Sequence, residues 1–588
     1  MKVYSKDILM FKYGLLLSVV LLIFSCSDSK PVNSEATESN FSLAYERSGG
    51  DSTSTYQEVI DFYEYLAGKD DRVSIESIYE TDSGEPLHLV SFKPEDVQEN
   101  PLKVLINNGI HPGESDGIDA TMLLFKEFSN NVSTLPTTIE IYTIPIYNVG
   151  GALNRNSNSR TNQNGPKAHG FRGNAKNYDL NRDFIKSDTK NSKAFYSIFH
   201  QVNPDVFVDT HVSNGADYQY TLTHLFTQHN KLGGALGQHL ENEFIPKVEA
   251  GLKAEDWDIT PYVNVSNTSP ERGFSQFNDS PRYSTGYTTL WNTLGLMIET
   301  HMLKPYKQRV EGTLEMLKTL VNVSHQQKES IQLARDENFK AFANAQVYPI
   351  NFEVDSSKTS TYNFLGYEVE SSTSEVTKLP RIKFRRDQPF EREVTYYNYF
   401  KPSDSILIPE AYIIPKQWSK VIELLKWNNI SYERFAEDTI VSVEEYRLID
   451  YKTRTSAYEG HYLHSETKVE AESIDKTYQQ GDVLVKTNQP GIRYIIETLE
   501  PAAVDSFFNW NFFDIILQQK EGFSPYVFED LAVEILKNNP KLQAEFENKQ
   551  NTDSEFANNW YQQLDWIHKH SKYYEEAHLT YPIVRVLK

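Results

Sequence analysis

The chain has 588 residues, 39% of them hydrophobic and 13% aromatic, so it can bury cores and is long enough for two or three domains. Its formal charge of −23 argues against a general nucleic-acid binder, which needs a basic surface to neutralise phosphates. The single cysteine, Cys26, excludes an intramolecular disulfide.

The N-terminus has the layout of a secretory signal. Lysines precede an apolar run at residues 13–24, which is too short for a spanning helix of about 20 residues. The run ends in Leu-Ile-Phe-Ser-Cys, which resembles a bacterial lipobox with Cys26 as the acylated residue; the alternative is an ordinary signal peptide with an incidental cysteine. We expect a signal peptide over residues 1–25, a flexible tether over 26–50, and an exported protein held by lipid in the bacterial cell envelope.

Residues 51–330 alternate between strand and helix patterns. A helix is predicted around 195–202, where apolar residues recur at helical spacing before Asn203-Pro204. The alternation predicts an α/β domain, a mixed, mostly parallel sheet flanked by helices. The predicted strands are short and apolar, as expected for strands buried on both faces: 87–92, 103–107, 139–144, 206–209 and 294–299.

The C-terminal half has a different pattern. Residues 345–525 are predicted to form a strand-rich α+β accessory domain, and residues 526–588 a helical segment. No group of side chains with metal-ligand or catalytic spacing stands out after residue 330. This half could support the catalytic domain, deliver substrate or bind a partner, and the sequence does not choose among these roles.

Three side chains supply the donors of a hydrolytic zinc site. His111 and Glu114 lie three residues apart around a Pro-Gly turn, after one predicted strand, and His211 follows another. Zinc in hydrolases usually takes three protein ligands and leaves one position for water. His111-x-x-Glu114 alone would more often be an exposed turn, but a buried His211 would be costly without a partner. Asp179 and Asp209 are candidates to orient the ligating imidazoles.

Four short segments in this order resemble the zinc metallocarboxypeptidases related to carboxypeptidase A, over about residues 55–325. The segments are His-Pro-Gly-Glu at 111–114, Phe-Arg-Gly-Asn-Ala-Lys-Asn-Tyr-Asp-Leu-Asn-Arg at 171–182, Asp-Thr-His at 209–211 and Ile-Glu at 298–299. The second segment is the most specific. The resemblance implies a carboxypeptidase-like catalytic domain with one Zn²⁺ per chain, held by His111, Glu114 and His211.

The resemblance also implies roles for the remaining polar residues. Glu299 would be the general base and Arg172 would stabilise the oxyanion. Asn181 and Arg182 would clamp the terminal carboxylate, so the substrates would be peptides with a free C-terminal carboxylate. The family's mobile tyrosine would correspond to Tyr283, with Tyr287 as the alternative.

The sequence departs from the family pattern at three places. Asp183 stands where the family commonly has asparagine, Asn-Val-Gly-Gly at 148–151 replaces an Asn-Pro-Asp-Gly turn, and His301 is outside the pattern. Two other functions therefore remain open. One is a zinc amidase acting on acyl amino acids or cell-wall peptides, and the other is a non-catalytic binding module of the envelope.

Overall fold

The structure is a computed structural model that describes residues 42–265 and 268–587. The predicted signal peptide and Cys26 lie outside the described residues, as does most of the predicted tether. Ala44–Arg47 forms helix α1, and Leu43 and Tyr45 are buried, so packed structure begins before residue 50. No helix within the described ranges is long and apolar enough to cross a membrane.

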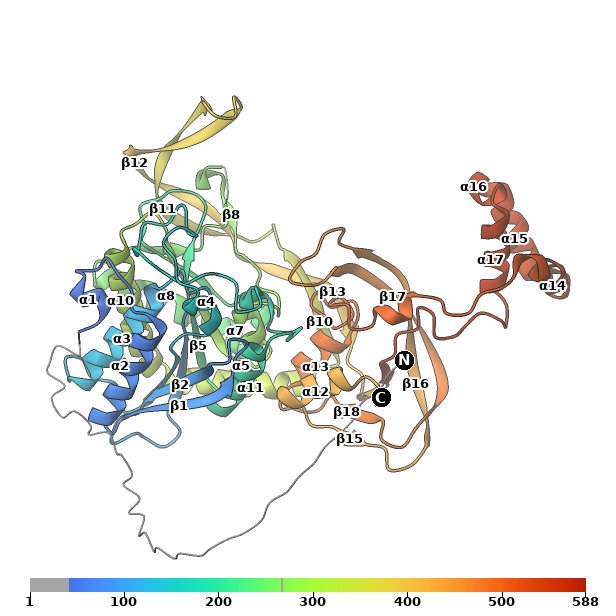
Figure 1. The fold of residues 1–588 in the computed structure, drawn as a ribbon, viewed down its shortest axis with the longest axis horizontal. Helices are drawn as coiled ribbons and strands as arrows, with labels where there is room; N and C mark the ends of the chain where they lie inside the picture. The colour runs from blue at the N-terminus through green and yellow to red at the C-terminus, as the bar shows by residue number, and fades with distance from the viewer. Residues whose placement is uncertain (1–41, 266–267, 588) are drawn as a thin grey trace, which may run out of the picture. The chain divides into compact units, whose positions relative to one another are not determined.

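An eight-stranded sheet with the order β1-β2-β4-β3-β5-β9-β6-β7 forms the centre of the N-terminal half (Figure 1). The four neighbouring strands β4, β3, β5 and β9 run parallel. On one side of them, β2 pairs antiparallel with β4, and β1 pairs antiparallel with β2; on the other side, β6 pairs antiparallel with β9. This confirms the predicted mixed, mostly parallel sheet. Its strands are β1 (Val73–Glu80), β2 (Pro86–Phe92), β3 (Leu102–Asn107), β4 (Ile139–Ile144), β5 (Val206–Ser213), β6 (Leu222–Phe226), β7 (Ile259–Pro261) and β9 (Leu294–His301).

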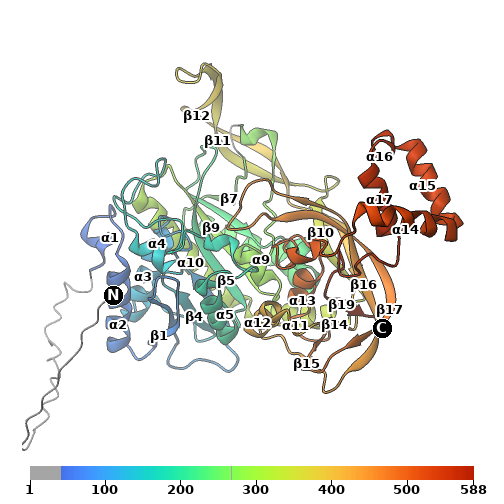
Figure 2. The same cartoon turned by 45° about the vertical axis from the view of Figure 1, so that its right-hand side comes forward.

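Helices cover the sheet on both sides. Every residue of β4, β5 and β9 is buried, which requires packing on both faces. In Figures 1 and 2, α2, α3 and α10 lie on one side of the sheet and α5 on the other. The helices of this half are α2 (Tyr56–Lys69), α3 (Asp116–Ser129), α4 (Val149–Leu153), α5 (Lys190–Val202), α6 (His229–Leu232), α7 (Gly234–His239), α8 (Ile245–Ala254), α9 (Ser284–Thr289), α10 (Tyr306–Gln326) and α11 (Lys328–Asn344).

Two strands extend further than their apolar patterns predict. Strand β5 continues past Asp209 through His211 to Ser213, and β9 continues past Glu299 to His301. All of the extra residues except Val212 are polar, but the two strands pair along this whole stretch, with His211 opposite Glu299. The hydrogen-bonded pairing of the two strands therefore places His211 and Glu299 side by side on adjacent strands of the sheet.

The C-terminal half is rich in antiparallel strands, as predicted. A six-stranded sheet has the order β15-β18-β14-β19-β16-β17, and β11 and β12 form a long hairpin whose β12 also pairs with β8 (Phe274–Ser275). The strands are β10 (Val347–Val354), β11 (Ser360–Thr373), β12 (Pro380–Tyr397), β13 (Phe400–Leu407), β14 (Ala411–Ile414), β15 (Glu433–Arg434), β16 (Thr439–Thr453), β17 (His464–Tyr478), β18 (Val483–Lys486) and β19 (Val584–Val586).

Helices α14 to α17 lie in the segment predicted to be helical and share a small apolar core that includes Phe528, Phe546 and Phe556. The same segment then ends in strand β19 of the six-stranded sheet, so it is not helical throughout. Residues Leu43–Lys588 make one compact unit, and the exact domain boundaries stay a prediction. The helices of this half are α12 (Ser419–Trp427), α13 (Ile492–Leu499), α14 (Pro525–Asn538), α15 (Pro540–Thr552), α16 (Ser554–Ala557) and α17 (Trp560–Lys569).

Candidate metal centre and active site

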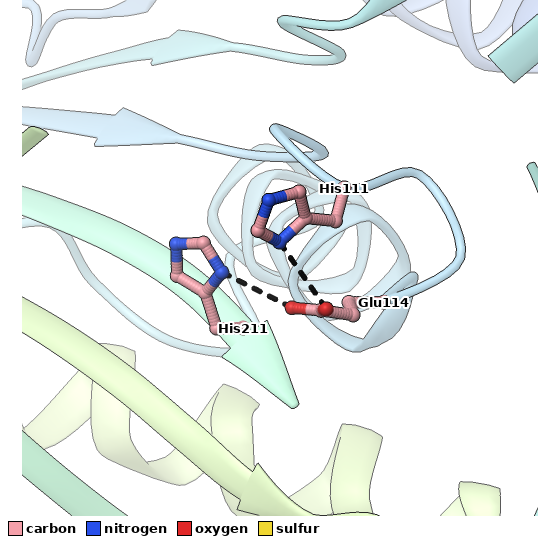
Figure 3. A group of neighbouring side chains, drawn as sticks. All are labelled: His111, Glu114 and His211. Atoms are coloured by element: carbon pink, nitrogen blue, oxygen red, sulfur yellow. Dashed lines mark hydrogen bonds and ion pairs between the residues drawn. The ribbon is translucent and has the colours of Figure 1, made fainter. Parts of the chain in front are cut away.

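His111, Glu114 and His211 converge at the carboxyl ends of the parallel strands (Figure 3). The Glu114 carboxylate lies between the two rings, with Oε1 3.2 Å from His111 Nδ1 and Oε2 3.0 Å from His211 Nδ1. One ligand atom from each residue lies within 4.8 Å of the other two, and all three residues are buried. Two imidazoles and one carboxylate are the donor set of a hydrolytic zinc site, so these residues fit the metal that the sequence predicts.

The backbone around this triad is built for close approach. A Cβ on Gly113 would lie 2.7 Å from Nε of Arg160, the side chain that reaches Glu114. A Cβ on Gly117, in the first turn of α3, would lie 2.0 Å from Thr210 Oγ1 on β5. A larger residue at Gly113 would displace Arg160, and one at Gly117 would push α3 away from the strand that carries His211.

Two aspartates hold the outer nitrogens of the imidazoles. Asp179 Oδ1 lies 3.0 Å from His111 Nε2, and Asp209 Oδ2 lies 2.9 Å from His211 Nε2. Each ring therefore presents Nδ1 to the centre, as expected for a ligating histidine oriented by a carboxylate. Burial favours neutral His211, yet the neighbouring carboxylates of Asp209 and Glu114 raise the pKa of His211 well above its ordinary value.

Glu299 faces the triad from strand β9 and is 8% exposed. Burial, with the nearby charges of Glu114 and Asp209, raises the pKa of Glu299 to about 8, although His211 and Arg172 oppose the shift. A carboxyl group with a raised pKa can both accept and release a proton near neutral pH, as a general acid–base group must.

Two guanidinium groups line the same cavity. Arg172 donates from Nε and Nη2 to Asp179 Oδ2 at 3.0 and 2.8 Å, which places its Nη1 3.7 Å from Glu114 Oε1. Arg182 lies over the ring of Tyr283, 4.4 Å from its centroid. The neighbouring Asn181 accepts at Oδ1 from the backbone N–H of Ser284 at 3.1 Å, which fixes its amide.

A cavity of about 240 Å³ unites the predicted site. The structure thus brings together predicted residues from β5, β9 and three connecting segments, while Asp179 lies behind His111. Tyr287 is not in the cavity: it is fully buried, and its hydroxyl donates to Asn428 Oδ1 at 2.7 Å. The predicted residues that line the cavity are His111, Glu114, Arg172, Asn181, Arg182, His211, Tyr283 and Glu299.

Sequence reasoning missed two charged residues of this site. Arg160 Nη2 lies 2.7 Å from Glu114 Oε1 and, against the effect of burial, helps to hold the pKa of Glu114 well below its usual range. Asp279 lines the cavity beside Leu225 and Met297 and is 5% exposed. Neither residue stands in a recognisable motif, so no local signal marked them.

The C-terminal half also reaches the site. The Glu459 carboxylate accepts from the backbone N–H of Asp179 at 2.8 Å, and His461 Nε2 lies 2.6 Å from Asp188 Oδ2. Arg282, next to Tyr283, lies 2.7 Å from Asp505. These contacts join elements more than 200 residues apart in sequence, and they support the interpretation of this half as a scaffold for the substrate side of the site.

Comparisons with known proteins agree with this geometry. The family model described as zinc carboxypeptidase matches residues 59–212, which contain all three candidate ligands. Carboxypeptidase 2 of Trichophyton rubrum is 20% identical over 432 residues, covering 70% of this chain and 74% of that protein. Carboxypeptidase 2 of Trichophyton equinum is 20% identical over 428 residues, covering 69% and 73%.

Among solved structures, a metallo-carboxypeptidase from Burkholderia cenocepacia aligns with a TM-score of 0.34 and 15% identity, covering 46% of this chain and 69% of that one. The segment that carries the three candidate ligands thus matches the zinc carboxypeptidase family model, and the chain is similar, at 20% identity, to carboxypeptidases over about two thirds of its length.

Proposed function

We propose that the protein is a zinc-dependent metallocarboxypeptidase that hydrolyses the C-terminal peptide bond of peptides. The observation that carries the proposal is the convergence of the His111–Glu114–His211 triad, Glu299 and the Arg182 guanidinium on one cavity. A metal triad and an acid–base group suffice for hydrolysis, and a fixed cation beside them selects substrates with a terminal carboxylate.

The metal and each active-site residue would have a separate role in peptide hydrolysis. Bound zinc would supply Lewis-acid activation of water and of the scissile carbonyl. Glu299 would take a proton from the attacking water, whose oxygen bonds to the carbonyl carbon, and would give that proton to the leaving nitrogen as the C–N bond breaks. Arg172 would stabilise the negative charge on the carbonyl oxygen.

Asn181 and Arg182 would hold the terminal carboxylate of the substrate. Arg182 donates from Nη1 to its own neighbour's carbonyl, Asn181 O, at 2.7 Å, and its stacking on Tyr283 limits how the guanidinium can turn. A planar guanidinium can donate two parallel hydrogen bonds to a carboxylate, which gives both charge and geometric selection.

A pair of peptides that differ only in a C-terminal amide tests this clamp. We expect kcat/KM for the amidated peptide to be lower by about 30-fold or more, because the half-buried Arg182 guanidinium loses its anionic partner in the substrate. Arg182→Met should lower kcat/KM for the peptide with a free C-terminal carboxylate, and should reduce the difference in kcat/KM between the two peptides. Equal cleavage by the wild type would contradict the clamp assignment, and turnover of N-acyl amino acids alone would favour the amidase.

Asp279 predicts a preference among C-terminal residues. Its Oδ2 accepts from Thr285, while Oδ1 is buried without a hydrogen-bond partner among the described residues. We expect kcat/KM to be higher for a C-terminal lysine than for a C-terminal glutamate. Burial raises the pKa of Asp279 to about 6, so the carboxylate is charged above that pH, and the preference should decline as pH falls through about 6.

Asp279→Asn is the matching variant for this prediction. It should lower kcat/KM for the lysine peptide and leave a C-terminal leucine peptide nearly unchanged. A lysine preference that persists in Asp279→Asn would assign the selectivity to another residue.

We also propose that the mature protein is anchored to the cell envelope by lipid on Cys26. Support comes from the lipobox-like sequence at residues 22–26 and the polar stretch that follows it. Metabolic labelling with an alkyne fatty acid should mark the wild type and not Cys26→Ala. Equal labelling of both, or of neither, would remove the anchor from the proposal.

A further inference from the structure

A second cavity, of about 310 Å³, lies on the other face of strand β6 from the metal triad. Leu225 lines the first cavity, whereas its neighbours His224 and Phe226 line the second. Successive residues of a strand point to opposite faces, so β6 is a shared wall. The remaining walls come from α6, the α7–α8 segment and the base of the β11–β12 hairpin.

Two histidine–glutamate pairs lie in this cavity, and the proposed reaction uses neither. His224 Nε2 lies 2.8 Å from Glu249 Oε1, and His229 Nδ1 lies 3.2 Å from Glu241 Oε2. The histidines are 4% and 8% exposed. In the part of the chain that the structure describes, no lysine or arginine forms an ion pair with either glutamate.

The pairing leaves hydrogen-bond acceptors facing inward. A carboxylate can only accept, so the imidazole nitrogen that faces each glutamate carries the N–H, and a neutral ring keeps a lone pair on its other nitrogen. Burial lowers the pKa of His229 to about 4, which keeps that ring neutral. Across residues 42–265 and 268–587, His224 Nδ1, His229 Nε2 and Asn398 Oδ1 are buried and lack a hydrogen-bond partner.

The cavity therefore holds two carboxylates that, among the described residues, have no lysine or arginine partner. Tyr362 Oη donates to Glu249 Oε1 at 3.1 Å, and Asn398 Nδ2 and Tyr399 Oη donate to Glu241 Oε1 at 3.3 and 3.4 Å, but these neutral donors do not balance the negative charge. Burial and the charge of Glu249 raise the pKa of Glu241, as expected for a carboxylate without a cation. Aromatic rings of Phe226, Tyr362 and Tyr396 complete the walls. Carboxylates, lone pairs and aromatic faces together suit an organic cation that carries several N–H donors.

The spacing favours an organic cation over a metal ion. Among the described residues, only His111, Glu114 and His211 bring three ligand atoms within 4.8 Å of one another. The imidazoles and carboxylates of the second cavity do not converge in this way. The volume lies at the low end of the range for small-molecule sites, about 300–1,000 Å³.

We propose that this second cavity binds a protonated alkylamine or a guanidinium compound of amino-acid or diamine size. The ammonium or guanidinium group donates to Glu241, Glu249 and the free imidazole nitrogens, and its alkyl chain lies against the aromatic rings. This proposal does not depend on the proposed peptidase activity, because it uses none of the residues of the first cavity.

Calorimetric titration of the purified full chain with agmatine and 1,5-diaminopentane tests the proposal, with 1,5-pentanediol as the uncharged analogue. We expect binding of at least one cation and no heat from the diol. In the Glu241→Gln/Glu249→Gln double variant, the dissociation constant should rise about 10-fold or more, because the cation loses both of its carboxylate partners. Glu249→Gln alone should give a smaller rise.

Glu243→Gln is the matched control. Glu243 lies in the same helical turn as Glu241, Leu240–Phe244, but its side chain is exposed and pairs with Lys247. It should leave the dissociation constant unchanged. Melting temperature and circular dichroism confirm that each variant is folded. The titration of Asp279→Asn separates the two cavities, because binding in the second should survive that change.

Three outcomes would overturn the proposal. They are the absence of binding by both cations, unchanged binding in the folded double variant, and loss of binding in Asp279→Asn, which would move the cation to the first cavity. If the wild type bound a divalent metal tightly but neither amine, and the double variant lost that metal binding, the cavity would be a metal site and the proposal of an organic cation would be wrong.

Discussion

Replacing Glu299 by glutamine should lower kcat for peptide hydrolysis by about 10²- to 10⁴-fold, the usual contribution of a positioned general base. The amide keeps the shape of the side chain but cannot accept the proton of the attacking water. Glu299 is not one of the three converging ligands, so the zinc content should stay at one ion per chain. Steady-state kinetics and metal analysis of the same preparation measure both quantities.

Glu140→Gln is a suitable control for this experiment. Glu140 is also 8% exposed and also lies in the central sheet, on β4, but it bonds to Tyr142 and does not line the cavity. We expect its kcat to equal that of the wild type. A Glu299→Gln enzyme that retains more than about a tenth of the wild-type kcat would assign proton transfer to another group.

His211→Ala should abolish both zinc binding and activity. It removes one of three donors and leaves Glu114 with a single imidazole neighbour. A chelator should inactivate the wild type, and added Zn²⁺ should restore the wild type but not the variant. Zinc content per chain and the initial rate, measured before and after chelation, test this.

Two further variants sharpen the metal prediction. Asp209→Asn should weaken zinc affinity by about 10- to 100-fold without abolishing binding, because it removes the partner that orients His211. His88→Ala, on β2 and outside the cavity, should keep full zinc content and activity. Full activity of the zinc-free wild type would contradict the proposed mechanism.

The sheet was predictable because its strands have a strong local signal. Apolar runs such as residues 139–144 are buried along their whole length, and such runs have few alternatives to a central strand. The ends of β5 and β9 were less predictable, since polar residues at His211 and Glu299 break the apolar pattern while backbone pairing continues. Pairing with another strand is a tertiary property that the local sequence does not contain.

The candidate site shows the same division. The motif residues His111, Glu114 and Arg182 could be named because their spacing and neighbours are distinctive. Arg160 and Asp279 could not, since only the path of a loop brings Arg160 to Glu114 and Asp279 to the cavity. The choice between Tyr283 and Tyr287 also required the structure, because only packing shows that one ring meets Arg182 and the other is enclosed in the core.

The sequence by itself predicted a metal site of zinc-hydrolase type, because metal ligands and charged groups are fixed residue types at short, recognisable spacings. It also determined the alternation of strands and helices, since hydrophobic periodicity is local. Only the tertiary structure decided which polar residues share a cavity, how Glu459 and Asp505 support the substrate side, and that β6 separates two cavities. Contacts between residues hundreds of positions apart depend on how whole elements pack, and no local pattern encodes that packing.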